Sequence, residues 1–146
     1  MTGPGEDILA WTDAAISTAE RTAREAAEAA EGDSWEECNQ AVYVSGPGGD
    51  LLAEGVMYGD LFDPVRLPVV LHMVLNDPES VLRRCAADRK ILDLHTPQQD
   101  GSGIPGNVQC RTCSQGGGDG YLYLVYAPCA TILALAEGYG WTGGDR

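Results

Sequence analysis

The chain has 146 residues, 44% hydrophobic and 21% charged, a composition typical of one globular domain rather than a disordered chain. Its formal net charge of −13 is concentrated in residues 1–63, which hold fourteen acidic and two basic side chains, whereas residues 64–146 hold eight and seven. Such a negative field repels nucleic acid phosphates and membrane surfaces, and it suits solubility, a basic protein partner or imitation of DNA.

The N-terminal residues 1–11 contain neither a basic segment nor an apolar core, so we expect no signal peptide. The longest apolar run, residues 67–75, is too short to span a bilayer and contains Pro68 and His72. The expected location is therefore the cytoplasm, where thiols stay reduced. Five cysteines then favour metal ligands or free thiols over disulfides.

A long helix is predicted over residues 6–31, which are rich in alanine and glutamate and contain no glycine or proline. Helical spacing places one apolar stripe on it, formed by Ile8, Trp11, Ala15, Ala19, Thr22 and Ala26. Gly32 is the predicted stop. Side chains on the stripe become small after Ile16, so this end of the helix either packs closely or projects loosely.

A β-hairpin is predicted next, because residues 41–44 and 51–57 are rich in strand-forming side chains and flank a Gly/Pro/Asp turn at 46–50. Residues 58–63 are expected to form a loop. The apolar residues 64–75 fit a strand or a helix: Pro64 favours a first helical turn, and Pro68 shortens or kinks the helix.

The strongest helix prediction covers residues 77–95. Asp77 is a good N-cap, and Pro78 occupies a position where a missing N–H costs nothing. One face carries Val81, Cys85, Leu92 and His95, with Asp88 between them. The side chains expected in solvent are Arg83, Arg84, Arg89 and Lys90.

The last third of the chain is expected to form a loop at 96–109, a Cys-rich turn, a flexible run at 114–120, a strand at 121–126 and a short helix opening at Ala127-Pro128-Cys129. Ile132, Leu133 and Ala136 should share one side of that helix, and the tail should fray beyond Trp141. We therefore predict an α+β fold with one domain over residues 1–146, frayed at 1–5 and 142–146.

Metal chemistry is suggested by the pair Cys110-x-x-Cys113, because a tight turn can present both sulfurs to one ion. Zinc takes four tetrahedral thiolate and imidazole ligands. His95 lies 15 positions before the pair and Cys129 lies 16 positions after it, each at the edge of a predicted element. We predict that three or four of His95, Cys110, Cys113 and Cys129 bind zinc and order the surrounding loops.

Two other interpretations of the cysteine pair stay open: a redox pair, disfavoured because no helix begins at Cys110, or no role. Cys85 is expected to be a small core residue, too far along the helix from His95 to share an ion. Cys38 is expected to be a free or half-buried thiol. His72 is expected to be a hydrogen-bonded core residue and is the reserve ligand if His95 points away.

The chain resembles the DUF6221 family, an actinobacterial and actinophage family of unknown function. The resemblance covers most of the chain and is specific at 72–95 and 128–140, where the matching residues are His72, Asp77, Pro78, Val81, Leu82, Arg89, Ile91, Leu92, His95, Pro128, Cys129, Thr131, Leu135, Ala136, Tyr139 and Gly140. Cys85 departs from the charged or polar residue expected there. The resemblance implies a small intracellular protein encoded by an actinobacterium or a phage, and it implies no activity.

No catalytic residues are predicted, because nucleophile elbows, phosphate-binding loops and the zinc deaminase pattern do not occur in the sequence. The leading hypothesis is a zinc-stabilised protein that binds a macromolecule through its acidic half. Its partner is expected to be basic or to handle nucleic acid, as with a phage DNA mimic.

Two alternative functions remain. One is a zinc-dependent nucleic-acid-binding module that uses Arg83, Arg84, Arg89 and Lys90, which the net charge disfavours. The other is a zinc hydrolase with three protein ligands, in which Asp88 or Asp93 serves as the base.

Overall fold

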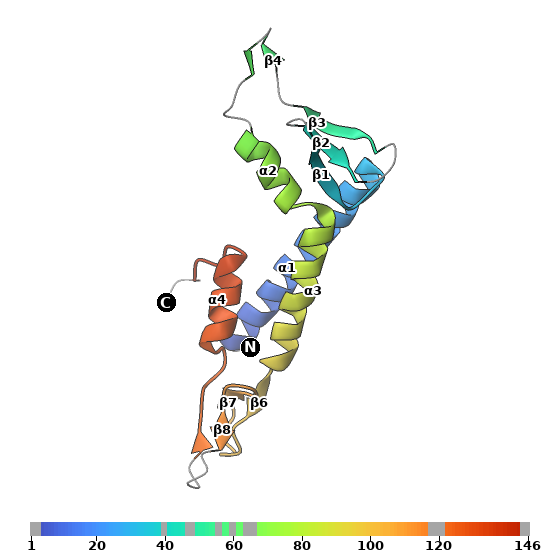
Figure 1. The fold of residues 1–146 in the computed structure, drawn as a ribbon. Helices are drawn as coiled ribbons and strands as arrows, with labels where there is room; N and C mark the ends of the chain where they lie inside the picture. The colour runs from blue at the N-terminus through green and yellow to red at the C-terminus, as the bar shows by residue number, and fades with distance from the viewer. Residues whose placement is uncertain are drawn as a thin grey trace. The chain divides into compact units, whose positions relative to one another are not determined.

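The computed structural model describes residues 4–38, 41–45, 49–54, 57–58, 61–62, 67–116 and 122–143. The predicted α+β class is confirmed: four helices are combined, among the described residues, with short antiparallel strands (Figure 1). The chain divides into two compact units, unit 1 (Met1–Ser17 and Ala86–Arg146) and unit 2 (Thr18–Cys85). The single domain expected from the sequence stays a prediction. Within the described residues, no helix combines the length and apolar character needed to cross a membrane.

The predicted N-terminal helix is α1, Pro4–Ala30, which contributes residues to both units. Its buried positions differ from the predicted stripe by about one residue: Thr12 and Ile16 are fully buried, whereas Thr22 is exposed. Thr12 can be buried because its hydroxyl donates a 2.6 Å hydrogen bond to the Ile8 carbonyl oxygen, so its polar group is satisfied within the helix.

The end of α1 is set by Glu31 rather than by Gly32. Glu31 takes the left-handed conformation with φ 56°, and the Gly32 N–H then donates to the Ala27 carbonyl oxygen at 2.9 Å. Gly32 is needed for a different reason: a Cβ atom there would collide with Cγ1 of Val44. The glycine therefore permits the sheet of unit 2 to approach the end of α1 closely.

That sheet has three antiparallel strands in the order β1 (Trp35–Cys38), β2 (Ala41–Val44) and β3 (Leu51–Glu54). The predicted hairpin corresponds to β2 and β3, although residues 46–48 and 55–56 lie outside the described residues. The sequence analysis missed β1, in which Trp35 pairs with Val44 and Cys38 with Ala41. Residues 58–63 were expected to be a loop, yet β4 (Met57–Tyr58) pairs with β5 (Leu61–Phe62).

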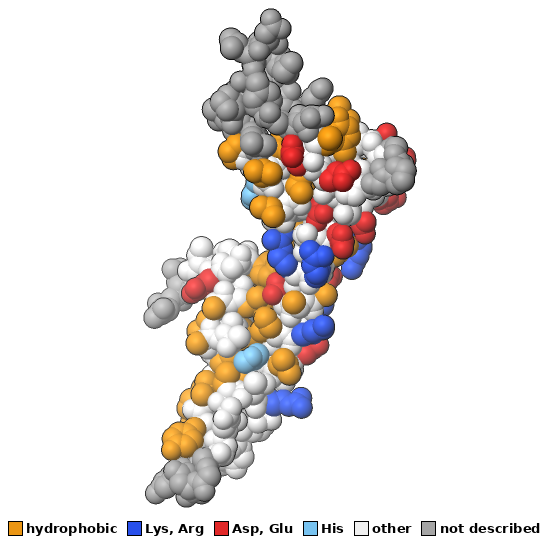
Figure 2. Space-filling view, in the orientation of Figure 1, with side chains coloured by type: hydrophobic (Ala, Val, Ile, Leu, Met, Phe, Trp, Pro, Cys, Tyr) orange, Lys and Arg blue, Asp and Glu red, His pale blue; other side chains and the backbone are white. Residues whose placement is uncertain are grey.

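The ambiguous apolar segment forms α2, Leu67–Leu75, which packs against β1 and β2 (Figure 1). Pro68 lies in its first turn, where the missing N–H costs no hydrogen bond. Pro64 lies outside the described residues. Hydrophobic side chains gather on the surface of α2 (Figure 2), where Val69 is 58% exposed and Leu75 is 70% exposed.

Helix α3, Pro78–Leu94, confirms the strongest helix prediction. Asp77 caps it: one carboxylate oxygen accepts the Ser80 N–H at 2.8 Å, and the other accepts the Trp35 N–H at 3.1 Å. One buried side chain therefore joins the start of α3 to the edge strand β1 within unit 2. Cys85 is 1% exposed and is the core residue that was expected.

Unit 1 contains two short hairpins, β6 (Pro97–Gln99) with β7 (Val108–Cys110), and β8 (Gln115–Gly116) with β9 (Leu122–Tyr123). The predictions of a loop at 96–109 and a flexible run at 114–120 were therefore partly wrong, and residues 117–121 lie outside the described residues. The expected strand at 121–126 is reduced to β9 and one isolated pairing, between Gln109 and Tyr126.

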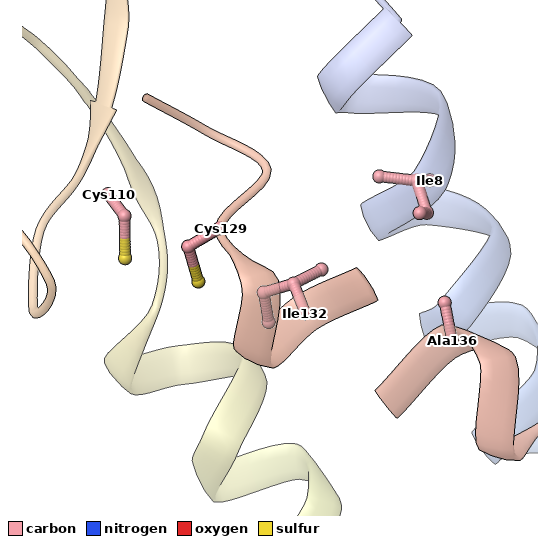
Figure 3. Packing of buried hydrophobic residues seen from close by; sticks show 5 residues of the cluster. All are labelled: Ile8, Cys110, Cys129, Ile132 and Ala136. Carbon is pink, nitrogen blue, oxygen red and sulfur yellow. The ribbon is translucent and has the colours of Figure 1, made fainter. Parts of the chain in front are cut away.

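Helix α4, Ala130–Gly138, begins where the sequence predicted. It buries Ile132 and Ala136 against Ile8 of α1, whereas Leu133, expected on the same side, is 39% exposed (Figure 3). After the helix, Trp141 packs edge-to-face against Trp11 with ring centroids 5.0 Å apart. This contact fixes the chain as far as Trp141.

Candidate metal centre

Each of the four predicted ligands lies where a secondary structure element begins or ends. His95 follows α3 directly, and its N–H still donates to the Ile91 carbonyl oxygen at 3.1 Å. Cys110 is the last residue of β7, Cys113 lies in the turn after it, and Cys129 is the N-cap of α4. Rigid elements therefore carry three of the four side chains toward one point.

The structure brings these four residues together. Nδ1 of His95 lies 3.4 Å from the sulfur atom of each of the three cysteines. All four ligand atoms lie within 4.8 Å of one another. Zinc bonds of about 2.3 Å to sulfur and about 2.0 Å to nitrogen would place tetrahedral nitrogen and sulfur ligands roughly 3.5 Å apart. The group can hold a metal ion of this size, and metal ligation itself stays a prediction.

Hydrogen bonding alone does not account for this arrangement. A neutral imidazole offers one hydrogen or one lone pair at Nδ1, so that atom cannot make three hydrogen bonds at once. Three equal distances of 3.4 Å from Nδ1 to the sulfur atoms are compatible with four ligand atoms around a shared metal ion.

The turn that carries Cys110 and Cys113 is held on two sides. The Thr112 hydroxyl donates to the Leu94 carbonyl oxygen, and the Arg111 N–H donates to the Thr96 carbonyl oxygen at 3.1 Å, so the turn is fixed to the end of α3. Ser114 then accepts the Val125 N–H through its hydroxyl at 3.0 Å. The sequence analysis missed these supports, for which the hydroxyl residues inside and after the Cys-x-x-Cys motif were the available signal.

The three thiols have unlike electrostatic environments. Burial, and then the neighbouring thiols of Cys110 and Cys129, raise the pKa of Cys113 to about 12. Burial alone would also raise the pKa of Cys129, but the Ile132 and Thr131 amides at the start of α4, together with the neighbouring thiols, lower it.

The cluster is continuous with the hydrophobic core of unit 1. Cys110 is 0% exposed and Cys129 is 2% exposed, and both belong to the buried group that contains Ile8, Ile132 and Ala136. In Figure 3 the sulfur atoms of Cys110 and Cys129 extend into the same space, between the hairpin and α4. Two residues of the cluster are therefore also part of the hydrophobic core of unit 1.

The other cysteines and the second histidine are not part of the cluster. Cys38 is an exposed free thiol, and Cys85 is buried in unit 2. His72 was expected in the core, but it is exposed on α2, where the Asn76 amide lies 3.3 Å from its Nδ1 atom. The prediction of a core histidine was wrong, because Val70 rather than His72 is buried on α2.

Comparison with known families shows that residues 5–140 match the family described as "Family of unknown function (DUF6221)". The chain belongs to the DUF6221 family. The match covers all four residues of the cluster and both units of the fold, so it confirms the resemblance seen in the sequence. No curated protein and no solved structure matches this DUF6221 protein.

Proposed function

We propose that this protein contains a structural zinc site and acts by binding a basic macromolecular partner. The observation that carries the zinc assignment is the set of three 3.4 Å distances from Nδ1 of His95 to the sulfurs of Cys110, Cys113 and Cys129. Thiolate and imidazole ligands in a tetrahedral set favour zinc over magnesium or calcium, which prefer oxygen.

A structural role is favoured over catalysis because four protein ligands complete a tetrahedron and leave no position for a substrate or an activated water. The two acids considered as bases give no further support to a hydrolase. Asp88 accepts a 2.7 Å hydrogen bond from the Tyr139 hydroxyl, and Asp93 is exposed at the end of α3. The ion would instead tie α3, β7 and α4 together.

Partner binding is supported by the charge of unit 2, which holds thirteen acidic and five basic side chains. Within residues 25–37 there are six acids and neither lysine nor arginine, and all six are exposed. Acidic side chains also gather around the sheet of unit 2 (Figure 2). A surface of this kind attracts basic segments and speeds their encounter.

Direct binding of nucleic acid is the weaker alternative, because three of the four basic side chains of α3 are engaged within the chain. Arg89 donates to Asp13 at 2.6 Å, Arg83 donates to Glu79 at 3.3 Å, and Arg84 donates to Asn76 at 2.9 Å. Binding of phosphates would have to break these contacts in an acidic field.

Affinity measurements with charge-reversal variants test the partner-binding proposal. A captured partner should lose at least tenfold in affinity for Glu25→Lys/Glu28→Lys and retain it for Asp93→Lys/Glu137→Lys, which changes the net charge equally in unit 1. Equal effects of both variants on every captured partner would contradict the proposal. A low-salt gel shift would reveal binding to nucleic acid and would favour the alternative.

A further inference from the structure

Unit 2 contains an open cavity of about 330 Å³ between the second half of α1, β1 and the start of α3. Most of its lining is apolar and comes from Ala19, Ala23, Ala26, Trp35, Pro78 and Val81. A dry apolar cavity of about 150 Å³ can hold benzene, so this one has room for an aromatic side chain.

The cavity exists because the stripe of α1 changes from large to small side chains. Ile16 is fully buried, but the following positions on this side of the helix are Ala19, Ala23 and Ala26. Methyl groups do not reach the indole of Trp35 or the side chain of Val81 closely enough to fill the space. The sequence left open whether this end packs closely or projects loosely, and the structure shows a hollow instead.

Two of the polar side chains that line the cavity, Trp35 and Asn76, already have hydrogen-bond partners within the chain. The indole N–H of Trp35 donates to the Gly32 carbonyl oxygen at 3.3 Å. The Asn76 amide donates to the His72 carbonyl oxygen at 2.8 Å and accepts from Arg84 at 2.9 Å. The occupant therefore gains little from hydrogen bonds to these groups and is selected for apolar surface.

The charged residues near the cavity indicate which class of molecule supplies the apolar group that would fill it. The exposed acids of residues 25–37 adjoin the lining residues Ala26 and Trp35 in sequence, and Glu79 follows Pro78. The Glu79 N–H donates to the Asp33 carbonyl oxygen at 2.8 Å, so these two acidic residues lie on neighbouring backbone segments. Arg84 lies against the lining residue Asn76, but the acids outnumber it, so this setting disfavours carboxylate ligands such as fatty acids and favours lysine and arginine.

We propose that the cavity receives one aromatic side chain from a basic protein segment. The proposal rests on the proposed partner binding and identifies its central contact. Interfaces commonly gain most of their energy from a large side chain buried in a pocket and surrounded by weaker polar contacts. The aromatic ring would fill the hollow over Trp35, while basic residues beside it would face the acids of residues 25–37.

Two synthetic lysine-rich peptides, identical except for a central Phe or Ala, provide the test. The protein labelled with 5-fluorotryptophan reports binding by fluorine NMR, with Trp11 and Trp141 of unit 1 as internal controls. The Phe peptide should bind at least tenfold more tightly than the Ala peptide. It should shift the Trp35 resonance and leave the two control resonances unchanged.

A filled cavity should remove this preference. Ala23→Leu, with Ala26→Leu as a second filling variant, should bind both peptides equally, whereas Ala29→Leu on an exposed position of α1 should keep the tenfold difference. Circular dichroism melting identifies folded variants. If the unmodified protein binds both peptides equally and in a salt-sensitive way, the proposal that the cavity receives an aromatic side chain is wrong. The proposal of a basic partner would still hold. Failure of both peptides to bind at low salt would overturn both proposals.

Discussion

Nδ1 of His95 lies 3.4 Å from the sulfur of Cys129, although 34 positions separate the two residues in the chain. His95 directly follows α3 and Cys129 is the N-cap of α4, so this contact closes the longest loop of the candidate metal centre. The proposed zinc ion would hold the ends of these two helices together, and we therefore predict that its loss destabilises the protein.

The first prediction concerns Cys113→Ser, which removes one thiolate and leaves the other three ligands in place. Metal affinity should fall by at least tenfold, and the free energy of unfolding should fall by on the order of several kcal/mol, because metal binding contributes directly to folding. Metal titration and thermal melting measure both effects. Cys38→Ser, which changes an exposed thiol outside the cluster, is the matched control and should leave both unchanged.

The second prediction concerns the pH dependence due to Asp77. Burial alone would raise its pKa, but hydrogen bonds from Ser80 and Trp35, with the charge of Arg83, lower the pKa below its ordinary 3.8. The carboxylate therefore contributes stability that is fully present above the unfolded pKa and is lost as pH falls through the folded value.

Asp77→Ala should destabilise unit 2 by about 1 kcal/mol or more at pH 7, as for the loss of a helix N-cap. The difference from the unmodified protein should shrink as the pH falls below the ordinary 3.8. Denaturant unfolding followed at Trp35 measures this difference in unfolding free energy. Asp50→Ala, at an exposed position, serves as the control. A difference that is constant from pH 7 to pH 2.5 would argue against the cap.

The third prediction concerns the aromatic pair of unit 1. The edge-to-face contact of Trp11 with Trp141 should give a coupling energy of about 0.5–1.5 kcal/mol in a double-mutant cycle of Trp→Phe or Trp→Ala changes. An additive cycle would mean that the C-terminal segment does not pack as described.

The fourth prediction concerns Gly32→Ala, which introduces a methyl group against Cγ1 of Val44. Overpacking of this kind should cost about 1–3 kcal/mol of unfolding free energy. Gly138→Ala in α4 is the control, because a Cβ there meets no atom within 4 Å and alanine favours helix. An unchanged melting temperature for Gly32→Ala would show that β2 approaches α1 less closely.

Local signals were enough to predict α3 and the candidate metal centre. The Asp77-Pro78 cap acts within one turn, and each residue of the cluster lies at an element boundary that the sequence marks. Strands β1 and β6 were missed because glutamate and glutamine have weak strand preference, and it is pairing with the next strands along the chain, β2 and β7, that stabilises them. The buried stripe of α1 differs from the predicted one because Thr12 can be buried once its hydroxyl donates to the Ile8 carbonyl oxygen. The spacing of apolar residues in the sequence does not reveal this hydrogen bond.

The decisive experiment for the zinc site is to determine the metal content of the purified full chain by elemental analysis and native mass spectrometry. We predict one zinc ion per chain, with loss of the ion and a large fall in melting temperature after chelation or in Cys113→Ser. A metal-free protein that melts at the same temperature with and without added zinc would contradict it.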